Sequence, residues 1–330
     1  MMVKDWIRLI QARKWMKKTG AFLPAWHAYL GYSLDLFDLF HKPACPGCIA
    51  RLYNLDETLL RRWIEVGLTL GHLEPKGNGK VKSKKAYRRY LSKNSPYSIG
   101  ILLEEMLELH IPALLDYPSL INQNSKAPYL EKEYGGTVAQ TSELLESYAF
   151  PKIAERIKKR KAGSLLDMGC GYGGYLKRIY NQYPRMRLIG IEINPNVYQE
   201  AYTRLKHTAV EVRHEDMMAV EENDRRMEMI MMNNVLYYFP RESRPSLFEK
   251  AADMMTAKGT LLVISPLSNA KHGKAFSAAF NSFLSVHHNL FPLPSIKELK
   301  EDSKTSGFKI KRMDPVVKEG GWYLIELQKQ

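Results

Sequence analysis

The C-terminal half of the chain alternates short apolar runs with longer amphipathic segments, a pattern typical of a doubly wound α/β fold. A capping-box pattern at Ser295 and Glu298 predicts a late helix, which Gly307 would end before two final strands at residues 308–313 and 322–327. The earlier apolar runs have the length of buried parallel strands. These predicted strands are residues 165–166, 187–192, around 210–212, 229–232 and 260–265.

The N-terminal part has helical periodicity instead, with apolar residues at spacings of three and four. Predicted helices cover residues 34–40, a segment from Ile49, and residues 56–68, for which Asp56 is a plausible N-cap. A turn-rich stretch at 76–80 separates two short predicted strands, so the order resembles a winged helix. Residues 99–109 and 129–149 are also expected to be helical. The predicted domains are therefore residues 1–110, a helical bridge at 111–150, and an α/β domain at 151–330.

A glycine-rich loop follows the first predicted strand of the α/β domain. Its sequence is Asp167-x-Gly169-x-Gly171-x-Gly173, and the glycines let the backbone turn tightly and approach a ligand. The next strand ends in Glu192, about 20 residues further on, where a carboxylate can accept hydrogen bonds from ribose hydroxyls. The spacing predicts a site for a nucleoside-bearing cofactor.

Two further segments belong to the same predicted site. Asp216 follows the third strand and could accept a hydrogen bond from an adenine amino group. The fourth strand runs into Asn-Asn-Val-Leu-Tyr-Tyr-Phe-Pro at 233–240. Together these motifs resemble those of class I S-adenosylmethionine-dependent methyltransferases, over about residues 151–330. An aspartate two residues before the first glycine favours this family over NAD-binding enzymes, whose strand is more usually apolar up to the glycines.

That resemblance implies a Rossmann-like seven-stranded domain that binds S-adenosylmethionine through the loop glycines and a set of polar residues. A winged helix ahead of it is similar to small-molecule O-methyltransferases of natural-product metabolism, in which the N-terminal helices interlock between subunits. The resemblance therefore implies a homodimer and a small-molecule acceptor. A basic amphipathic segment with Trp6 and Trp15 fits a dimer interface better than a membrane surface. The implied cofactor-binding residues are Asp167, Gly169, Gly171, Gly173, Glu192, Asp216 and Asn233.

In the resembling enzymes a histidine commonly follows the fourth strand as the general base, whereas this chain has Tyr237 there. An unperturbed tyrosine, with a pKa of about 10, is a poor base at neutral pH. His287 and His288, between Phe283 and Phe291, are candidates for a base elsewhere. The alternatives are an acceptor that is already ionised, such as a carboxylate, and catalysis mainly by alignment of the reacting groups.

The chain carries a formal net charge of +14, and residues 76–93 contain eight Lys or Arg and no acidic residue. A solvated basic face is the commoner explanation, but an RNA methyltransferase guided by the wing is an alternative function. The segment at 233–236 differs from the Asn-Pro-Pro-Tyr or Asp-Pro-Pro-Tyr of enzymes that methylate exocyclic amines. No cysteine lies near it for carbon-5 cytosine chemistry. A noncatalytic protein that binds S-adenosylmethionine is the second alternative.

Cysteine content and hydropathy exclude several other classes. Three cysteines cannot form a disulfide framework. Cys45 and Cys48 form a Cys-Pro-Gly-Cys motif with no second pair to complete a zinc site, so the sequence favours a helix start and no metal. No apolar run reaches the roughly 18 residues of a membrane span, and the first twenty residues are too charged for a secretory signal. We expect a cytoplasmic enzyme.

Overall fold

The computed structural model describes residues 2–123, 126–220 and 226–330. The chain divides into two compact units, Met1–Leu109 and His110–Gln330. Each unit has its own hydrophobic core.

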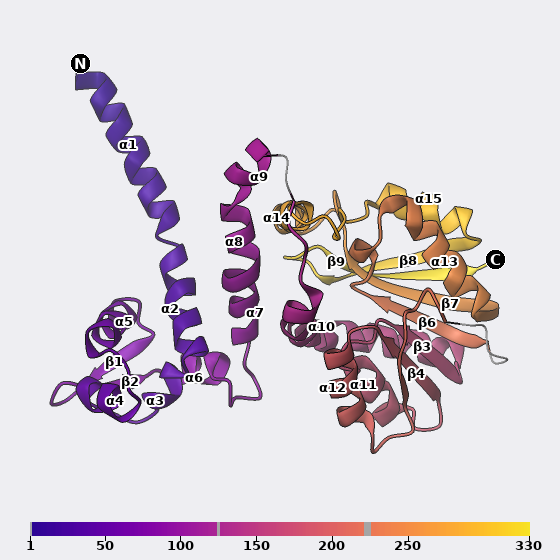
Figure 1. Cartoon of the computed structure of the whole chain (residues 1–330), viewed down its shortest axis with the longest axis horizontal. Helices are drawn as coiled ribbons and strands as arrows, with labels where there is room; N and C mark the ends of the chain where they lie inside the picture. The colour runs from indigo at the N-terminus through magenta and orange to yellow at the C-terminus, as the bar shows by residue number, and fades with distance from the viewer. Residues whose placement is uncertain (1, 124–125, 221–225) are drawn as a thin grey trace. The chain divides into compact units, whose positions relative to one another are not determined.

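The N-terminal unit is helical with one small β-hairpin (Figure 1). Its core contains Phe37, Phe40 and Trp63, which are almost completely buried. Helix α1 instead exposes its apolar side chains, including Trp6 and Trp15. The elements are α1 (Met2–Thr19), α2 (Phe22–Ser33), α3 (Leu36–Leu39), α4 (Pro46–Leu52), α5 (Glu57–Thr69), β1 (Leu73–Lys76), β2 (Lys80–Ser83), α6 (Lys85–Leu91) and α7 (Gly100–Glu104), followed by a π-helical turn at Glu105–His110.

Local details of this unit agree with most of the sequence predictions. The side chain of Asp56 accepts a hydrogen bond from the Leu59 backbone N–H at 2.8 Å, so the predicted N-cap of α5 is confirmed. Strands β1 and β2 pair antiparallel, as the turn-rich stretch indicated. The helix predicted at 34–40 is shorter, because Asp35 adopts a left-handed conformation with φ 54° and α3 begins only at Leu36.

The C-terminal unit is built around a seven-stranded sheet in the order β5-β4-β3-β6-β7-β9-β8. All neighbouring strands are parallel except at β9, which runs antiparallel to both β7 and β8. The predicted closing hairpin is therefore confirmed. The strands are β3 (Ser164–Met168), β4 (Arg187–Glu192), β5 (Glu211–His214), β6 (Met227–Asn233), β7 (Met255–Pro266), β8 (Phe308–Val317) and β9 (Trp322–Lys329).

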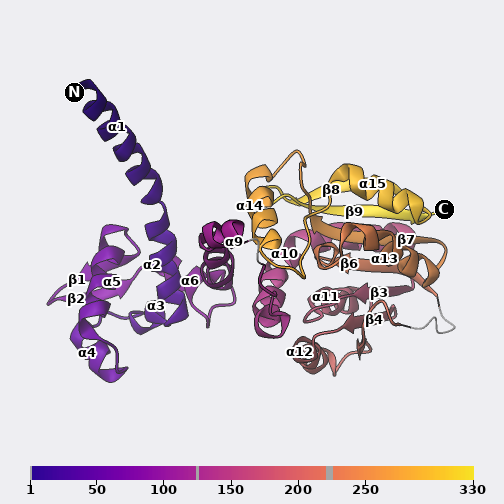
Figure 2. The ribbon, with the colours of Figure 1, turned by 45° about the horizontal axis from the view of Figure 1, so that its top comes forward.

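Helices cover both faces of this sheet (Figure 2). Alternate strand residues point to opposite faces, so Leu165 joins one apolar cluster and Leu166 the other. The first cluster packs against α10 and α11, and the second against α13 and α15. The helices are α8 (Ile111–Leu115), α9 (Tyr117–Gln123), α10 (Glu131–Arg160), α11 (Gly174–Gln182), α12 (Pro195–Leu205), α13 (Arg244–Asp253), α14 (Lys274–Ser285) and α15 (Ile296–Thr305), with 3₁₀ turns at Leu236–Tyr238 and Arg241–Ser243.

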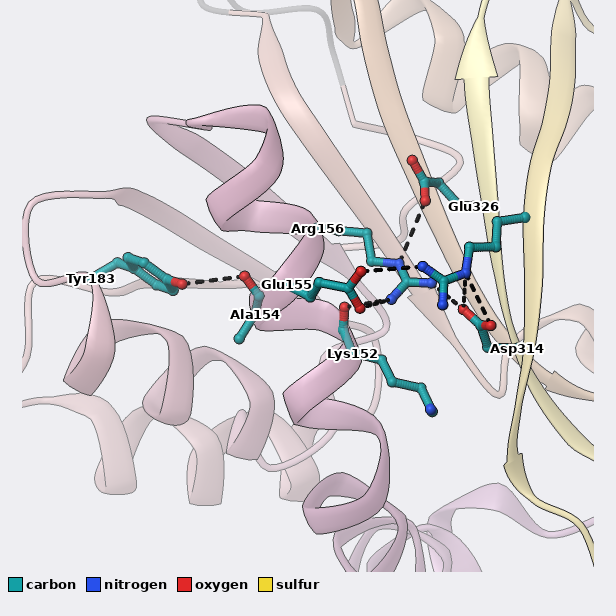
Figure 3. Close-up of polar contacts among 8 residues, drawn as sticks. Lys152, Ala154, Glu155, Arg156, Tyr183, Asp314 and Glu326 are labelled. Carbon is teal, nitrogen blue, oxygen red and sulfur yellow. Dashed lines mark hydrogen bonds and ion pairs between the residues drawn. The ribbon is translucent and has the colours of Figure 1, made fainter.

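Helix α10 is longer than the predicted helix at 129–149, since it continues through Pro151 to Arg160. Near its end, Arg156 is almost fully buried and points toward the closing hairpin (Figure 3). Its guanidinium forms ion pairs with Asp314 of β8 and, at 3.4 Å, with Glu326 of β9. This network ties α10 to the edge of the sheet.

The capping box of α15 is present, with Ser295 Oγ accepting from the Glu298 N–H and the Glu298 carboxylate accepting from the Ser295 N–H. Gly307, at φ 74°, ends that helix as predicted. Over the described residues, no helix is both long and apolar enough to cross a membrane.

Candidate cofactor and acceptor site

A cavity of about 390 Å³ opens at the carboxyl ends of the central strands. Strand β3 lies between β4 and β6, so the chain order reverses at this point of the sheet. Open α/β sheets bind ligands at such a reversal. Residues predicted from separate motifs line this one cavity, namely Gly169, Gly171, Glu192, Asp216, Asn233 and Tyr237.

The glycine loop needs its glycines for backbone reasons. Gly169, Gly171 and Gly173 all have positive φ, at 79°, 55° and 74°. A Cβ at Gly171 would meet no atom within 4 Å, so this position faces open space at the cavity. A Cβ at Gly173 would instead lie 2.5 Å from the Leu205 side chain. Gly171 therefore borders the ligand space, whereas Gly173, which is not among the cavity-lining residues, permits close packing of α12.

Glu192 holds the loop in place. One oxygen of its carboxylate accepts from the Gly171 N–H at 3.0 Å, and the other accepts from the Asn194 N–H at 2.9 Å. The side chain is mostly buried, and burial raises its pKa despite these backbone hydrogen bonds. Glu192 thus fixes the loop and presents a carboxylate at the cavity wall.

Asp167 and Asn233 come together because β3 and β6 are parallel neighbours in matched register. The Asn233 side-chain amide donates to Asp167 Oδ1 at 3.0 Å. Asp167 is completely buried, and burial raises its pKa strongly, with nearby Glu146 adding to the effect. Asp167 Oδ2 and Asn233 Oδ1 are buried with no hydrogen-bond partner among the described residues. Asn233 lines the cavity, whereas Asp167 is not among the lining residues and is linked to the site through Asn233.

Glu146 of α10 is a site residue that the motif analysis missed. It lines the cavity, is only 7% exposed, and accepts a hydrogen bond from Arg178 Nε at 3.0 Å. A Cβ on Gly174 would lie 1.9 Å from its carboxylate, so that glycine makes room for it. The signal available in the sequence was the spacing of Gly135, Val138, Ser142 and Glu146, which places one face of a helix on the cavity.

The remaining cofactor candidates have simpler surroundings. Asp216 lies just beyond β5 on the cavity wall, and its Oδ1 accepts from the Met218 N–H at 2.9 Å. Gly135 also lines the cavity, close to the Asn194 side chain.

Tyr237 is buried on the 3₁₀ turn after β6 and lines the cavity beside Tyr238, with ring centroids 5.0 Å apart. Its ring also packs edge-on against Phe280 of α14. The buried guanidinium of Arg244 fixes this turn, since it donates to the backbone oxygens of Leu236 and Pro292. The turn and the segment after α14 are thereby held together.

His287 and His288 follow α14, which ends at Ser285, so their directions are not set by helical geometry. His287 is buried with Nδ1 3.0 Å from the Phe283 carbonyl oxygen, and its ring meets Tyr129 edge-on. Burial lowers its pKa, which favours the neutral imidazole. His288 is exposed. Neither histidine is among the described residues that line the cavity. Phe280 and Phe283 are buried, as expected of a core-facing stripe.

The carboxyl of Glu146 gives a pH-dependent prediction. Burial raises the pKa of Glu146 to about 7, so in the folded protein this carboxyl stays mainly protonated below that pH. The stability contributed by Glu146 is fully present below its unfolded pKa of about 4.3 and is lost as the pH rises through about 7. Glu146→Gln should therefore be more stable than the wild type at pH 8, by up to about 3 kcal/mol, and similar to it at pH 4.

Urea unfolding of both proteins between pH 4 and 8 measures this difference. Glu143→Gln, one turn earlier on α10, is the matched control because Glu143 is more exposed and pairs with Arg204. If the difference in unfolding free energy between the wild type and Glu146→Gln does not change with pH, the raised pKa of Glu146 is contradicted.

Comparison with known proteins identifies the same region. Residues 165–259 match a family described as "Methyltransferase domain". Among curated proteins, the chain is 24% identical over 139 residues to the S-adenosylmethionine-dependent methyltransferase UmaA of Mycobacterium tuberculosis, covering 41% of this chain and 46% of UmaA. It is also 24% identical over 161 residues to cyclopropane mycolic acid synthase 1 of that organism, covering 46% and 55%. The chain thus spans about half the length of the curated relatives it matches.

Solved structures share the fold over nearly the whole chain. An O-methyltransferase family protein from Burkholderia thailandensis superposes with a TM-score of 0.80 and 16% identity, covering 97% of this chain and 98% of that one. Human N-acetylserotonin methyltransferase, solved in complex with S-adenosylmethionine, gives 0.79 and 15%, with coverage of 96% and 97%. The family match over residues 165–259 and the shared fold together show that the chain contains a methyltransferase-type domain. A helical N-terminal region precedes the seven-stranded domain in the chain.

Proposed function

We propose that the protein transfers a methyl group from S-adenosylmethionine to an oxygen atom of a small-molecule acceptor. The observation that carries the proposal is the single cavity in which the glycine loop, Glu192 and Asp216 meet Tyr237 and Tyr238. The first three are chemically suited to a nucleoside-bearing cofactor, and the tyrosines line the same cavity.

The residues fit the cofactor in a specific way. Glu192 offers carboxylate oxygens to the ribose hydroxyls, and Asp216 offers an acceptor to the adenine amino group. Gly171 leaves room for the methionine end, and Gly169 lines the cavity in close contact with Val235. The orphaned oxygen of Asn233 can accept a hydrogen bond, Asp167 holds the Asn233 amide in place, and Glu146 adds a carboxyl that favours a cationic ligand when ionised. When bound, S-adenosylmethionine supplies an electrophilic methyl group on a positively charged sulfur.

On the acceptor side, aromatic residues shape the cavity and exclude water, and this role is better supported than that of a general base. The Tyr237 and Tyr238 rings line the cavity, and α14 contributes Phe280 against Tyr237. Such apolar surroundings destabilise the separated charges of the reactants. They therefore favour direct transfer of the methyl group between aligned donor and acceptor atoms. An acceptor that is already ionised needs no base, and we therefore favour a carboxylate or an acidic hydroxyl as the methylated group.

A labelling experiment tests the proposal. Purified protein is incubated with methyl-labelled S-adenosylmethionine and a metabolite extract of its host, and small molecules are separated from nuclease-sensitive polymer before counting. Label in an oxygen-linked methyl group of a small metabolite is the expected result. Glu192→Ala, which removes a cofactor contact, serves as the inactive control.

The same experiment separates the alternatives. The exposed positive residues of β2 and α6 favour RNA as a second candidate acceptor. Label in nuclease-sensitive polymer would replace our proposal with that function. Tight cofactor binding with no labelled product from any host extract would favour a noncatalytic binding protein.

Tyr237 is predicted to orient the acceptor. Tyr237→Phe should lower kcat/KM for the identified acceptor about fivefold, since one hydrogen bond contributes about 1 kcal/mol, and should leave the cofactor Kd unchanged.

His287→Gln should reduce activity more than His288→Gln, because only His287 is buried among the aromatic residues near Tyr129. An equal response of the two histidine variants would remove His287 from the acceptor site.

We also propose that the protein is a cytoplasmic homodimer formed through its N-terminal helices. The exposed apolar side chains of α1, among them Trp6, Ile10 and Trp15, support an interface on that helix. A monomeric sedimentation coefficient at micromolar concentration would contradict the dimer.

A further inference from the structure

Two thiols lie together at the surface of the N-terminal unit, outside the cofactor cavity. Cys45 immediately precedes α4 in an extended conformation, and Cys48 lies in the first turn of that helix. The Cys48 N–H donates to the Cys45 carbonyl oxygen at 3.1 Å. One helical turn therefore brings the two cysteines to neighbouring positions at the start of α4.

The pair is also accessible, unlike the third cysteine. Cys48 is exposed and Cys45 is half-buried, whereas Cys170 is buried within the glycine loop, between Gly169 and Gly171. Reaction of a thiol with a small disulfide requires both access and a thiolate. Cys45 and Cys48 meet the first requirement, and Cys170 does not.

The surroundings of the two sulfurs differ in a way that assigns them separate roles. The hydrogen bond from the Cys48 thiol lowers the pKa of Cys45, and backbone amides of the turn add to this effect. The same hydrogen bond raises the pKa of Cys48, while the Arg51 guanidinium lies 3.9 Å from its sulfur. The difference in pKa favours the thiolate form at Cys45 over Cys48.

A metal site is not supported at this position. A closed zinc site needs four ligands. Within residues 2–123, 126–220 and 226–330, no group of three or more Cys, His, Asp or Glu side chains is arranged to hold a metal ion. The two thiols therefore have the proximity for disulfide chemistry without the partners for coordination.

We propose that Cys45 and Cys48 form a redox-active dithiol that exchanges with low-molecular-weight disulfides. The Cys45 thiolate attacks one sulfur of the oxidant, whose sulfur–sulfur bond breaks and releases one thiolate. Cys48 then loses its proton and attacks the Cys45 sulfur, which releases the second thiolate. Two protein thiols are oxidised to one disulfide, the oxidant is reduced to two thiols, and the two protons pass to those products.

The test uses the reduced full-length protein and oxidised glutathione. Samples are acid-quenched, alkylated and analysed by peptide mass spectrometry. The wild type should form a Cys45–Cys48 disulfide that dithiothreitol reverses. Cys48→Ser should retain glutathione on Cys45, because no resolving thiol follows. Cys45→Ser should react at least about tenfold more slowly, because the remaining thiol has the smaller thiolate fraction. Cys170→Ser is the matched control and should behave like the wild type.

Two results would overturn the proposal. In one, the wild type fails to react or keeps glutathione on either cysteine without closing the disulfide. In the other, Cys45→Ser reacts as fast as Cys48→Ser. The wild-type arm needs no substitution, so the test holds even where a cysteine variant folds poorly. A negative result would leave the two cysteines only the structural role of residues at the start of α4.

Discussion

Gly171→Leu is expected to weaken S-adenosylmethionine binding about 100-fold or more, equivalent to about 3 kcal/mol, while the fold is retained. The glycine has φ 55°, and its Cβ direction meets open space at the cavity. A leucine side chain there would occupy ligand volume. The backbone amide of Gly171 also donates to Glu192, so displacement of the loop would disturb the carboxylate that we propose binds the ribose.

The matched control is Gly307→Leu in the same unit. Gly307 has φ 74°, and its Cβ direction also meets open space, but it follows α15 and does not line the cavity. Both variants carry a similar backbone strain of about 1–2 kcal/mol. Isothermal calorimetry with S-adenosylhomocysteine measures the affinities. Unchanged affinity of the Gly171 variant would refute the cofactor assignment, and equal losses in both variants would attribute the effect to strain.

Arg156→Met should lower the free energy of unfolding by about 3–5 kcal/mol, the usual cost of removing one partner from a buried ion pair. The Arg156 side chain is 2% exposed, and its partners Asp314 and Glu326 are 17% and 12% exposed. Without the guanidinium, the largely buried Glu326 carboxylate loses this counter-ion, and Asp314 keeps its ion pair with the half-exposed Arg312. Urea unfolding followed by circular dichroism measures the change.

Arg312→Met is the control, since Arg312 also contacts Asp314 but is 50% exposed. Exposed pairs contribute about 1 kcal/mol or less, so this variant should be only slightly destabilised. Adding Asp314→Asn to Arg156→Met should restore part of the loss. Similar effects of the two arginine variants would show that the buried network contributes no more than a surface pair.

The sequence predicted those parts of the site that depend on local chemistry. The glycine loop was predictable because its residues require positive φ, and Glu192 because it ends the next strand. The hydrogen bond between Asp167 and Asn233 depends instead on the register between β3 and β6, which no local pattern specifies. Asn233 itself could be proposed only from the resemblance.

Other features depend on tertiary placement and escaped prediction. Glu146 lies upstream of every motif and reaches the cavity only because α10 packs beside the first turn of α11. The fold class and the closing hairpin were predicted correctly, whereas the start of α3 was missed because Asp35 is left-handed.

The two halves of helix α10 have different roles, and hydrogen exchange of their backbone amides should distinguish them. Its first half borders the cavity at Gly135, Ser142 and Glu146, while its second half is anchored by Arg156. Between them, Pro151 lacks the N–H that would otherwise bond to the preceding turn. Deuterium uptake before Pro151 should therefore slow when cofactor binds, whereas uptake after it should follow only global opening of the unit.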